Sequence, residues 1–559
     1  MMKVFIKDNS LNKKITNTLS ELAKERIIER IWEKDYTIWG NKPDEISNRL
    51  GWLDSAEATS KAISEIEEFV NSVKSEGFTN TLLMGMGGSS LAPEVLRLTF
   101  GVKKGYLDLS VLDSTHPDAV KEFSDKLEIK NTLFIVSTKS GGTIETISFM
   151  KYFYTKAVKE MGGKKAGNNF IAITDPGSGL ERMARELNFR KIFINDPNIG
   201  GRFSALSLFG IVPAVLGGVK INEIIERTNT MVIECRNVEN NPASNLGVIL
   251  GVLAKEGIDK LTFISSPRIK FLGAWIEQLI AESTGKNGKG ILPVDLEELL
   301  SPKYYSKDRL FVHLKIHDDS TYEKEVKELI ASGFPVIEIK LEDNYDLGKE
   351  FFRWEFATAI AGWVLNIQPF DQPDVESAKV QARKMMTEYT GTGKLPELDH
   401  IFFAEGISVS GDIKANSLND ALNKFLRKIQ EGKSYVAMQA YLKPDDTTTN
   451  LLQQLRTVIQ TKYKVATSLG YGPRFLHSTG QLHKGDSGNG LFIQLTGEPN
   501  NDLPIPINPG SDDSEITFGI LMKAQALGDR EALLHNRRNV ISFNLGSDVA
   551  RIEKIIDEL

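Results

Sequence analysis

The stretch FIVSTKSGGTIETISFM, residues 134–150, changes character halfway along. It begins with apolar residues, passes through hydroxyls, a lysine and two glycines, and returns to apolar residues from Ile144 onward. This order predicts a strand, a tight turn and a helix. The free NH groups at the start of such a helix suit a phosphate dianion, and Thr138, Ser140 and Thr143 would add donors. The alternative is a capped turn without a ligand, because Ser and Thr are also good N-caps.

The region from about residue 80 to 220 repeats this pattern. Each repeat has a short apolar run, then Gly, Ser, Asp or Pro residues, then a helical pattern. The repeats are NTLLMGMGGSSLAPEVLRL, LSVLDSTHPDAVKEF, TLFIVSTKSGGTIETISFM and FIAITDPGSGLERMARELN. Strands that alternate with helices predict a doubly wound parallel sheet, with ligands at the carboxyl ends of its strands.

The pattern restarts near residue 240 and predicts a second α/β domain. Its strands are expected in LTFISSPRIKF, RLFVHLKIHDD and FPVIEIKLED, followed by a long helix at 346–365. Helices at 374–390 and 417–430 lead to strands in SYVAMQAYL, GLFIQLTGE and NVISFNLGS, with a helix near 518–536. We expect one flexible insert, TGEPNNDLPIPINPGSDDSE, at 496–515.

These patterns divide the chain into four expected segments. They are a helical lead-in at 1–45, a first α/β domain at 46–235, a second at 236–430 and a C-terminal α/β segment at 431–559. The last segment either completes the second domain, which we favour, or forms a small third domain.

The composition is that of a folded globular protein. Of the 559 residues, 41% are hydrophobic and 25% are charged, and the net charge of -6 is spread without blocks of one sign, so no footprint for nucleic acid or a membrane surface is present. The single cysteine, Cys235, fits a reducing compartment, and the start MMKVFIKDNS lacks the apolar core of a signal peptide. We therefore expect a cytoplasmic protein. The nearly uncharged run at 203–219 is too short for a membrane span and predicts a buried helix.

Neither a cofactor nor a metal is expected. The glycines of GMGGSSLAPE do not fit the GxGxxG pattern of dinucleotide loops, which argues against a nicotinamide cofactor. The chain also shows no clustered pattern of carboxylate and histidine ligands.

Several motifs together resemble one family. STKSGGTIE resembles the phosphosugar loop of sugar isomerase domains, with Thr138 in its first serine position. GGRFSALSLFG (200–210), EQLIAESTGKNGKGILP (277–293) and QPFDQPDVESAKVQA (368–382) resemble glucose-6-phosphate isomerases. RIWEKDYTIW and GYGPRFLHSTGQLHKG resemble the isomerase half of bacterial fusions with transaldolase. The resemblance covers roughly residues 30–545.

The resemblance implies two doubly wound sugar isomerase domains and an aldose-ketose isomerase that works through a cis-enediol intermediate. It assigns proton transfer to Glu282, stabilisation of the enediolate to Arg202, and ring opening to His477 and Lys379. It implies a phosphosugar substrate held by a larger group of residues: Gly88, Ser89, Thr138, Lys139, Ser140, Thr143, Gln278 and Gln372. Gln278 lies one helical turn before Glu282, and a helix over 372–379 would aim Gln372 and Lys379 the same way.

The histidine motif departs from the family in its order. In the isomerases it resembles, the histidine motif precedes FDQ…K, whereas His477 follows that motif here by about a hundred residues. A rearranged second domain would account for this order, and His477 could then fold back within its own chain instead of reaching a neighbouring subunit. Whether the protein is a monomer or a homodimer stays open, and His483 matches no role.

Three other functions are considered. An isomerase that also accepts mannose 6-phosphate, or one for an amino-sugar phosphate, would share the base, the cation and the phosphate loop. A non-catalytic phosphosugar regulator would not need Glu282 together with Arg202. A metal-dependent hydride shift is disfavoured by the missing ligand pattern.

Overall fold

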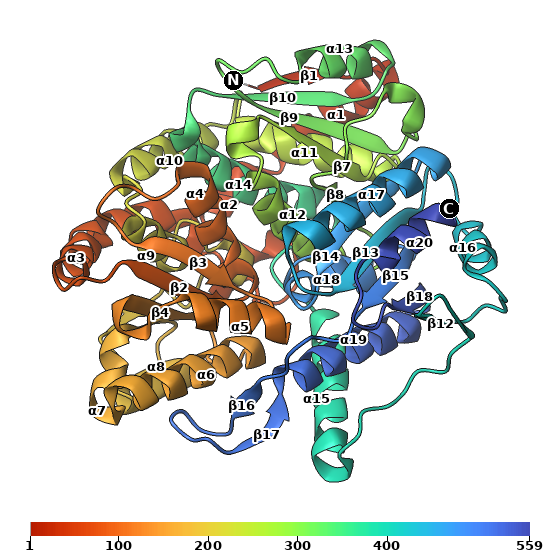
Figure 1. The fold of residues 1–559 in the computed structure, drawn as a ribbon. Helices are drawn as coiled ribbons and strands as arrows, with labels where there is room; N and C mark the ends of the chain where they lie inside the picture. The colour runs from red at the N-terminus through yellow and green to blue at the C-terminus, as the bar shows by residue number, and fades with distance from the viewer. Residues whose placement is uncertain (1) are drawn as a thin grey trace.

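The computed structural model describes residues 2–559, which form three large α/β sheets and a two-stranded ribbon (Figure 1). The first sheet is parallel throughout, in the order β3-β2-β4-β5-β6, as the repeats predicted. Its strands are β2 (Asn80–Gly85), β3 (Asp108–Leu112), β4 (Thr132–Ser137), β5 (Phe170–Thr174) and β6 (Lys191–Ile194). Because β3 and β4 lie on opposite sides of β2, the sheet has a topological switch between β2 and β4, where such folds bind ligands.

Helices connect these strands and cover the sheet. They are α3 (Ser55–Ser75), α4 (Leu91–Phe100), α5 (Pro117–Lys126), α6 (Ile144–Met161), α7 (Gly163–Ala166), α8 (Gly179–Glu186) and α9 (Leu208–Leu216). Most residues of α9 are buried, which confirms the buried helix predicted at 203–219. Among the described residues, no helix combines the length and the apolar character that crossing a membrane requires.

The second sheet has the order β1-β10-β9-β7-β8. Its strands are β1 (Met2–Phe5), β7 (Lys260–Ser265), β8 (Leu292–Val294), β9 (Arg309–Ile316) and β10 (Val336–Leu341). Its helices are α1 (Asn9–Lys24), α2 (Ile27–Trp32), α10 (Ile221–Arg236), α11 (Pro242–Lys255), α12 (Leu272–Thr284), α13 (Glu323–Ala331) and α14 (Leu347–Leu365). The lead-in is therefore not only helical, because β1 pairs antiparallel with β10 across more than 330 residues of chain.

The third sheet has the order β11-β12-β18-β15-β13-β14. Its strands are β11 (Phe402–Ala404), β12 (Ile407–Gly411), β13 (Tyr435–Tyr441), β14 (Ala466–Tyr471), β15 (Gly490–Thr496) and β18 (Asn539–Asn544). Its helices are α15 (Val375–Thr392), α16 (Leu418–Leu426), α17 (Asp446–Tyr463), α18 (Gly480–Gly485), α19 (Phe518–His535) and α20 (Arg551–Asp557). The C-terminal strands thus make a sheet of their own. The expectation that they complete the second sheet is wrong. The third sheet also begins before residue 431, since β11 and β12 belong to it.

The expected flexible insert contains an ordered ribbon. Strands β16 (Pro504–Pro506) and β17 (Ser514–Thr517) pair antiparallel. The ribbon docks on the first unit, where the NH of Gly510 donates to Thr155 Oγ1 of α6 at 2.9 Å. This contact brings a C-terminal segment against the helix that follows the predicted phosphate loop.

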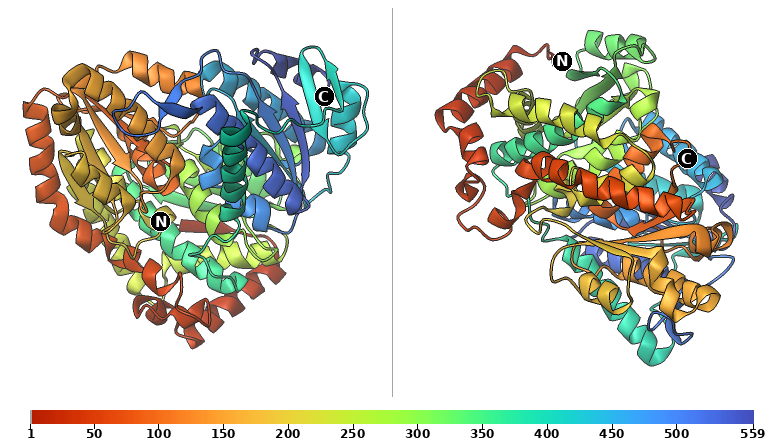
Figure 2. Two further views of the ribbon diagram at one scale, coloured as in Figure 1. Left: turned by 90° about the horizontal axis from the view of Figure 1, so that it is seen from below. Right: turned by 90° about the vertical axis from the view of Figure 1, so that its left-hand side faces the viewer.

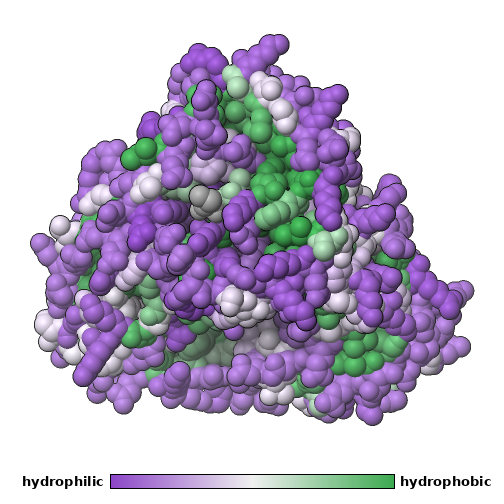
Figure 3. Space-filling view, turned by 90° about the horizontal axis from the view of Figure 1, so that it is seen from above, coloured by the Kyte–Doolittle hydropathy of each residue, from purple (hydrophilic) through white to green (hydrophobic). Residues whose placement is uncertain are grey.

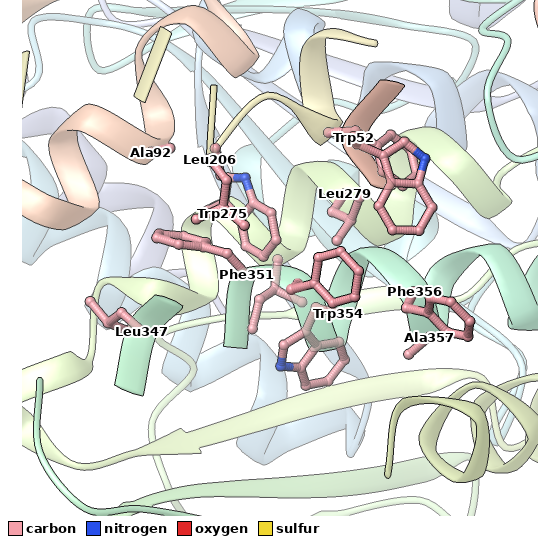
Figure 4. Close-up of a cluster of buried hydrophobic side chains, with 14 of the residues drawn as sticks. Trp52, Ala92, Leu206, Trp275, Leu279, Leu347, Phe351, Trp354, Phe356 and Ala357 are labelled. Carbon is pink, nitrogen blue, oxygen red and sulfur yellow. The ribbon is translucent and has the colours of Figure 1, made fainter. Parts of the chain in front are cut away.

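The core that supports the site lies between α12 and α14. Figure 4 shows Trp275 and Leu279 of α12 beside Phe351 and Trp354 of α14. The rings of Trp275 and Phe351 meet edge to face at 4.8 Å between centroids, a geometry that favours a fixed arrangement. Helix α12 is therefore packed firmly against α14.

The three units surround a central region (Figures 1 and 2). Both views place α15 between the first unit, coloured orange, and the third unit, coloured blue. The face shown in Figure 3 is largely hydrophilic, with hydrophobic residues gathered in a central band. Of the functional residues predicted from the sequence, Arg202, Gln278 and Glu282 are buried, whereas Ser140 and Lys379 are exposed.

Candidate active site

The loop between β4 and α6 has the predicted geometry of strand, glycine turn and helix. Gly141 has φ of 73°, and a Cβ there would lie 2.2 Å from the backbone nitrogen of Leu180, so only glycine fits. Thr143 is the N-cap residue of α6. The hydroxyls of Thr138 and Thr143 lie 3.0 Å apart, and Ser140 Oγ accepts the NH of Gly142 at 3.2 Å.

Lys139 and Thr138 do not line the cavity next to this loop. Lys139 Nζ forms an ion pair with Asp175 and donates to the carbonyl of Pro197 at 2.8 Å. Thr138 is buried. Of the predicted loop ligands, Ser140 and Thr143 line a cavity and Lys139 does not, because its ammonium is used to hold neighbouring loops together.

This cavity has a volume of about 680 Å³ and lies between the first unit and the C-terminal segments. It is lined by the phosphate loop, by α15, by the ribbon β16/β17 and by α19. Among its lining side chains are Ser140, Thr143, Glu145, Lys151, Lys379, Arg383, His477 and Gln525. Its size is in the usual range for small-molecule sites.

His477 and Glu145 form a pair at this cavity. His477 ends the short helix η11 (Arg474–His477), and its Nε2 lies 3.1 Å from Oε1 of Glu145 in α6. Gln525 of α19 donates to the same carboxylate oxygen at 2.7 Å. Burial acts to raise the pKa of Glu145, but the charge and hydrogen bond of His477 outweigh it and hold the pKa below its usual value. Glu145 was not predicted as a site residue, although it is the last residue of STKSGGTIE.

Helix η11 is anchored to the first unit and to α12. Arg474 forms an ion pair with Glu94 of α4, and its Nη1 lies 3.2 Å from Asp113 Oδ2 after β3. Burial raises the pKa of Asp113 to about 6, while Arg474 opposes that rise. Gln481 Nε2 of α18 donates to the carbonyl of Gly285 at 2.9 Å, just after α12. These contacts fix His477 against residues of its own chain.

Arg202 is the centre of a second, buried group of residues. It lies in η7 (Gly201–Phe203) and is 3% exposed. Its guanidinium donates to Ser283 Oγ at 2.7 Å, to Gln372 Oε1 at 2.9 Å, and to main-chain carbonyls of Pro369 and Asp371 at 2.6 and 2.9 Å. Nη1 also lies 3.5 Å from Glu282 Oε1. A fixed cation thus faces the carboxylate predicted to move the proton.

Gln278 connects this buried group to the cavity. Its Nε2 donates to Glu282 Oε2 at 3.1 Å, as their spacing of one helical turn predicted, and to the main-chain carbonyl of His477 at 2.8 Å. The other amide atom, Oε1, has no hydrogen-bond partner in the described part of the chain. Glu282, the carboxylate predicted to transfer the proton, and the segment of His477 therefore share one amide group.

Lys286 is a further charged residue beside Arg202 that was not predicted. Its Nζ donates to the carbonyl of Gln368 at 2.6 Å and to Asp371 Oδ1 at 2.6 Å. Burial, and then the charge of Arg202, lower its pKa to about 7 against the raising effect of Asp371. Nothing but its place in EQLIAESTGKNGKGILP distinguished Lys286 in the sequence, because the change in its pKa depends on burial.

The glycines of η4 (Gly87–Ser89) permit the close approach of these segments. A Cβ on Gly87 would lie 2.7 Å from Gln278 Nε2 and 2.8 Å from the carbonyl oxygen of His477. A Cβ on Gly88 would lie 1.9 Å from the carbonyl oxygen of Gly201. Gly87 therefore packs against Gln278 and Gly88 against the loop of Arg202, whereas neither Gly88 nor Ser89 lines the cavity described above.

Lys379 and Gln372 do not share a helix, so that expectation is wrong. Helix α15 begins only at Val375, after Pro373 and its N-cap Asp374. Gln372 bonds to Arg202, whereas Lys379 lies on the cavity wall with 48% of its side chain exposed. The predicted residues thus form two groups, a buried one around Arg202 and Glu282 and a cavity group with His477 and Lys379.

The described residues were also compared with the requirements of a metal site. Within residues 2–559 no group of three or more His, Cys, Asp or Glu side chains is placed to hold a metal ion. The chemistry that the arrangement offers is that of a carboxylate beside a fixed cation, next to a carboxylate-histidine pair.

Part of the chain is similar to known proteins. Residues 53–291 match the family model of phosphoglucose isomerase. The chain is 27% identical over 388 residues to a probable glucose-6-phosphate isomerase of Methanococcus maripaludis, covering 62% of this chain and 86% of that protein. It is 28% identical over 385 residues to the glucose-6-phosphate isomerase of Mycoplasmopsis pulmonis, covering 60% and 90%.

Two solved structures share the fold. A hypothetical protein of Thermus thermophilus superposes with a TM-score of 0.57 at 23% identity, over 69% of this chain and 99% of the other. A glucose-6-phosphate isomerase of Chlamydia trachomatis superposes with a TM-score of 0.56 at 17% identity, over 67% and 86%. The segment of this chain that is similar to the phosphoglucose isomerase family model contains the loop after β4, Arg202 and Glu282.

Proposed function

We propose that the protein interconverts glucose 6-phosphate and fructose 6-phosphate, by ring opening and proton transfer between C2 and C1 through a cis-enediol. The observation that carries this proposal is the position of Glu282, which is buried with Arg202 Nη1 3.5 Å from one oxygen and Gln278 Nε2 3.1 Å from the other. A carboxylate held in this way can take a proton from one carbon and return it to the next.

Arg202 supplies the positive charge that the intermediate needs. Negative charge develops on the enediolate oxygen during proton transfer, and a preorganised buried cation stabilises that charge more than water does. The donors of Arg202 already hold Ser283, Gln372 and two main-chain carbonyls, so the guanidinium does not have to reorganise during the reaction.

His477 and Lys379 serve ring opening in this proposal. The Glu145 carboxylate orients the imidazole through the 3.1 Å contact, so that His477 can transfer a proton to or from the ring oxygen. Lys379 supplies a further cation on the cavity wall. Ser140 and Thr143, together with the backbone NH groups at the start of α6, hold the phosphate at the other end of the cavity.

The substrate would then extend from the phosphate loop, past His477, toward Gln278 and Glu282. Gln278 bonds to the carbonyl of His477 and to Glu282, so it marks the path between the two groups of residues. We also propose that one chain supplies the whole site, that the protein works in the cytoplasm, and that it is of the type found fused to transaldolase in bacteria. The anchoring of His477 within the chain supports the first of these proposals, and the single buried Cys235 supports the second. The motif GYGPRFLHSTGQLHKG supports the third.

The experiment that tests the proposed function is a fructose 6-phosphate isomerase assay on the purified chain. We expect turnover that is unchanged by EDTA. Both substrates would use the same base and cation, so the site residues do not distinguish a dual-specificity isomerase from the proposed one. A parallel assay with mannose 6-phosphate distinguishes them. No turnover of any of these phosphosugars would contradict the proposal.

A further inference from the structure

A second cavity lies in the third unit, on the other side of α19 from the candidate active site. Its volume is about 590 Å³, within the range typical of small-molecule sites. Leu521 and Gln525 of α19 face the active-site cavity, whereas Met522, Lys523 and Ala526 face the second one. No residue of the proposed isomerase site lines it.

The floor of this cavity is a row of polar side chains that runs across neighbouring strands. Gln494 of β15 is in register with Ser542 of β18, and Ser542 is in register with Ser410 of β12. Their exposures are 1%, 4% and 3%. Successive residues alternate between the faces of a strand, and the opposite face carries the apolar core, as for Ile493 and Ile541. Polar groups so deeply buried have a cost unless they form hydrogen bonds.

The side chains of this row form hydrogen bonds within the protein. Ser542 Oγ donates to Gln494 Oε1 at 3.2 Å, Gln494 Nε2 donates to the carbonyl of Ala526 at 3.0 Å, and His400 Nδ1 lies 3.2 Å from Ser410 Oγ. The next row up the wall contains Thr496 and Ser408, which line the cavity and whose hydroxyls form no hydrogen bond with another of residues 2–559. Hydroxyls are therefore presented to the cavity from two adjacent rows.

Charge is confined to the rim. Lys394 and Glu397 are exposed, and Lys523 and Glu498 form an ion pair at 2.7 Å with 42% and 47% of their side chains exposed. The start of α19 is already capped, because Thr517 Oγ1 accepts the NH of Ile520. A phosphate would thus find neither a buried cation nor a free helix end at the floor.

The walls of the cavity are aromatic and aliphatic. Tyr389 at the end of α15 and Tyr441 at the end of β13 line the cavity together with aliphatic residues such as Leu395. Aromatic and aliphatic walls with a few placed hydroxyl and amide groups suit a molecule with both hydroxyls and an apolar face, such as a sugar ring.

We propose that this cavity binds an uncharged, hydroxyl-rich molecule of the size of a mono- or disaccharide. The place of this cavity in the fold agrees with a ligand site, because the cavity lies at the carboxyl ends of β15 and β18. The third sheet is wound like the first, with β14 and β15 on opposite sides of β13, and open α/β sheets bind ligands at that end of their strands. The ligand site is independent of the proposed isomerase activity.

The test is isothermal titration of the full chain with three uncharged probes, D-glucose, sorbitol and sucrose, and with inorganic phosphate as the charged comparator. We expect at least one uncharged probe to bind with a millimolar or lower Kd. The double variant Thr496→Val/Ser408→Ala removes two lining hydroxyls that hold no internal hydrogen bond, and it should weaken that binding at least about tenfold.

The matched control is Thr447→Val/Ser547→Ala, which makes the same two changes at exposed positions of the third unit outside the cavity. It should bind the probe like the wild type. Melting followed by circular dichroism shows that both double variants fold. The proposal is overturned if none of the uncharged probes binds at 10 mM (on the order of 3 kcal/mol of affinity), if binding survives in Thr496→Val/Ser408→Ala, or if phosphate alone depends on these hydroxyls.

Discussion

His477 and Glu145 lie 332 positions apart in the sequence, yet His477 Nε2 is 3.1 Å from Glu145 Oε1. The first residue comes from a loop of the third unit and the second from the helix after the phosphate loop of the first unit. The pair therefore joins the two units at the wall of the active-site cavity, and it is further held by Gln525 of α19.

Glu145 should stabilise the folded protein in a pH-dependent way. Because His477 holds the pKa of Glu145 below its usual value in the folded state, the stabilisation is present above the unfolded pKa and is lost as pH falls through the folded pKa. At pH 7 we expect Glu145→Gln to lower the free energy of unfolding by about 1–3 kcal/mol. Urea denaturation of both proteins at pH 7 and below pH 4 measures this difference. A difference in free energy of unfolding that is the same below pH 4 as at pH 7 would contradict the stabilising role of the ionised Glu145.

In the predicted phosphate loop, Ser140 and Thr143 line the cavity but Lys139 does not, so their substitutions should affect substrate binding differently. Ser140→Ala with Thr143→Ala removes two hydroxyls from the cavity, so the KM for fructose 6-phosphate should rise by about tenfold or more. Lys139→Met is the control, since its ammonium pairs with Asp175 and not with the cavity. It should change stability and leave KM close to that of the wild type. Steady-state kinetics of both variants measure these KM values. Equal increases in KM would contradict the assignment of phosphate binding to Ser140 and Thr143 and not to Lys139.

Sequence patterns were sufficient where function depends on local spacing. Gln278 and Glu282 are one helical turn apart, and their contact follows from α12 alone. The first sheet was also predictable, because each of its strands is followed by its own helix.

Long-range contacts could not be read from the sequence. Nothing local distinguishes Glu145 from an exposed helix carboxylate, and its role depends on a histidine that the chain supplies 332 residues later. Strands β13, β15 and β18 were recognised, but the partners they pair with are set by packing, so their separate sheet was missed. The start of α15 after Pro373 likewise separated Gln372 from Lys379.

Lys286 should make stability increase with pH. Its folded pKa, lowered to about 7 mainly by burial, lies below the unfolded value near 10.5, so the folded protein binds fewer protons between these pH values. Relative to Lys286→Met, the wild type should gain about 3 kcal/mol in free energy of unfolding between pH 7 and 9.5. Chemical denaturation of both proteins at these two pH values tests it. A constant difference would show that the ammonium is not held in the way the buried contacts require.

Mixing of two inactive variants tests whether each site is made from one chain. Glu282→Gln and His477→Ala chains are unfolded together and refolded as a mixture. Since His477 contacts Glu145 and Gln278 within its own chain, every site in the mixture should keep one defect, and activity should stay at the level of the separate variants. If native gels show exchanged dimers and activity returns, the site is shared between chains.

The most direct measurement concerns Glu282 as the base. Glu282→Gln keeps the size and the contact with Gln278 but cannot accept a proton, so turnover of fructose 6-phosphate should fall at least ~100-fold. Calorimetry should show that fructose 6-phosphate still binds, and exchange of solvent deuterium into the C1 and C2 positions should be lost in parallel with turnover. Turnover and exchange near wild-type levels in the Glu282→Gln protein would contradict the account.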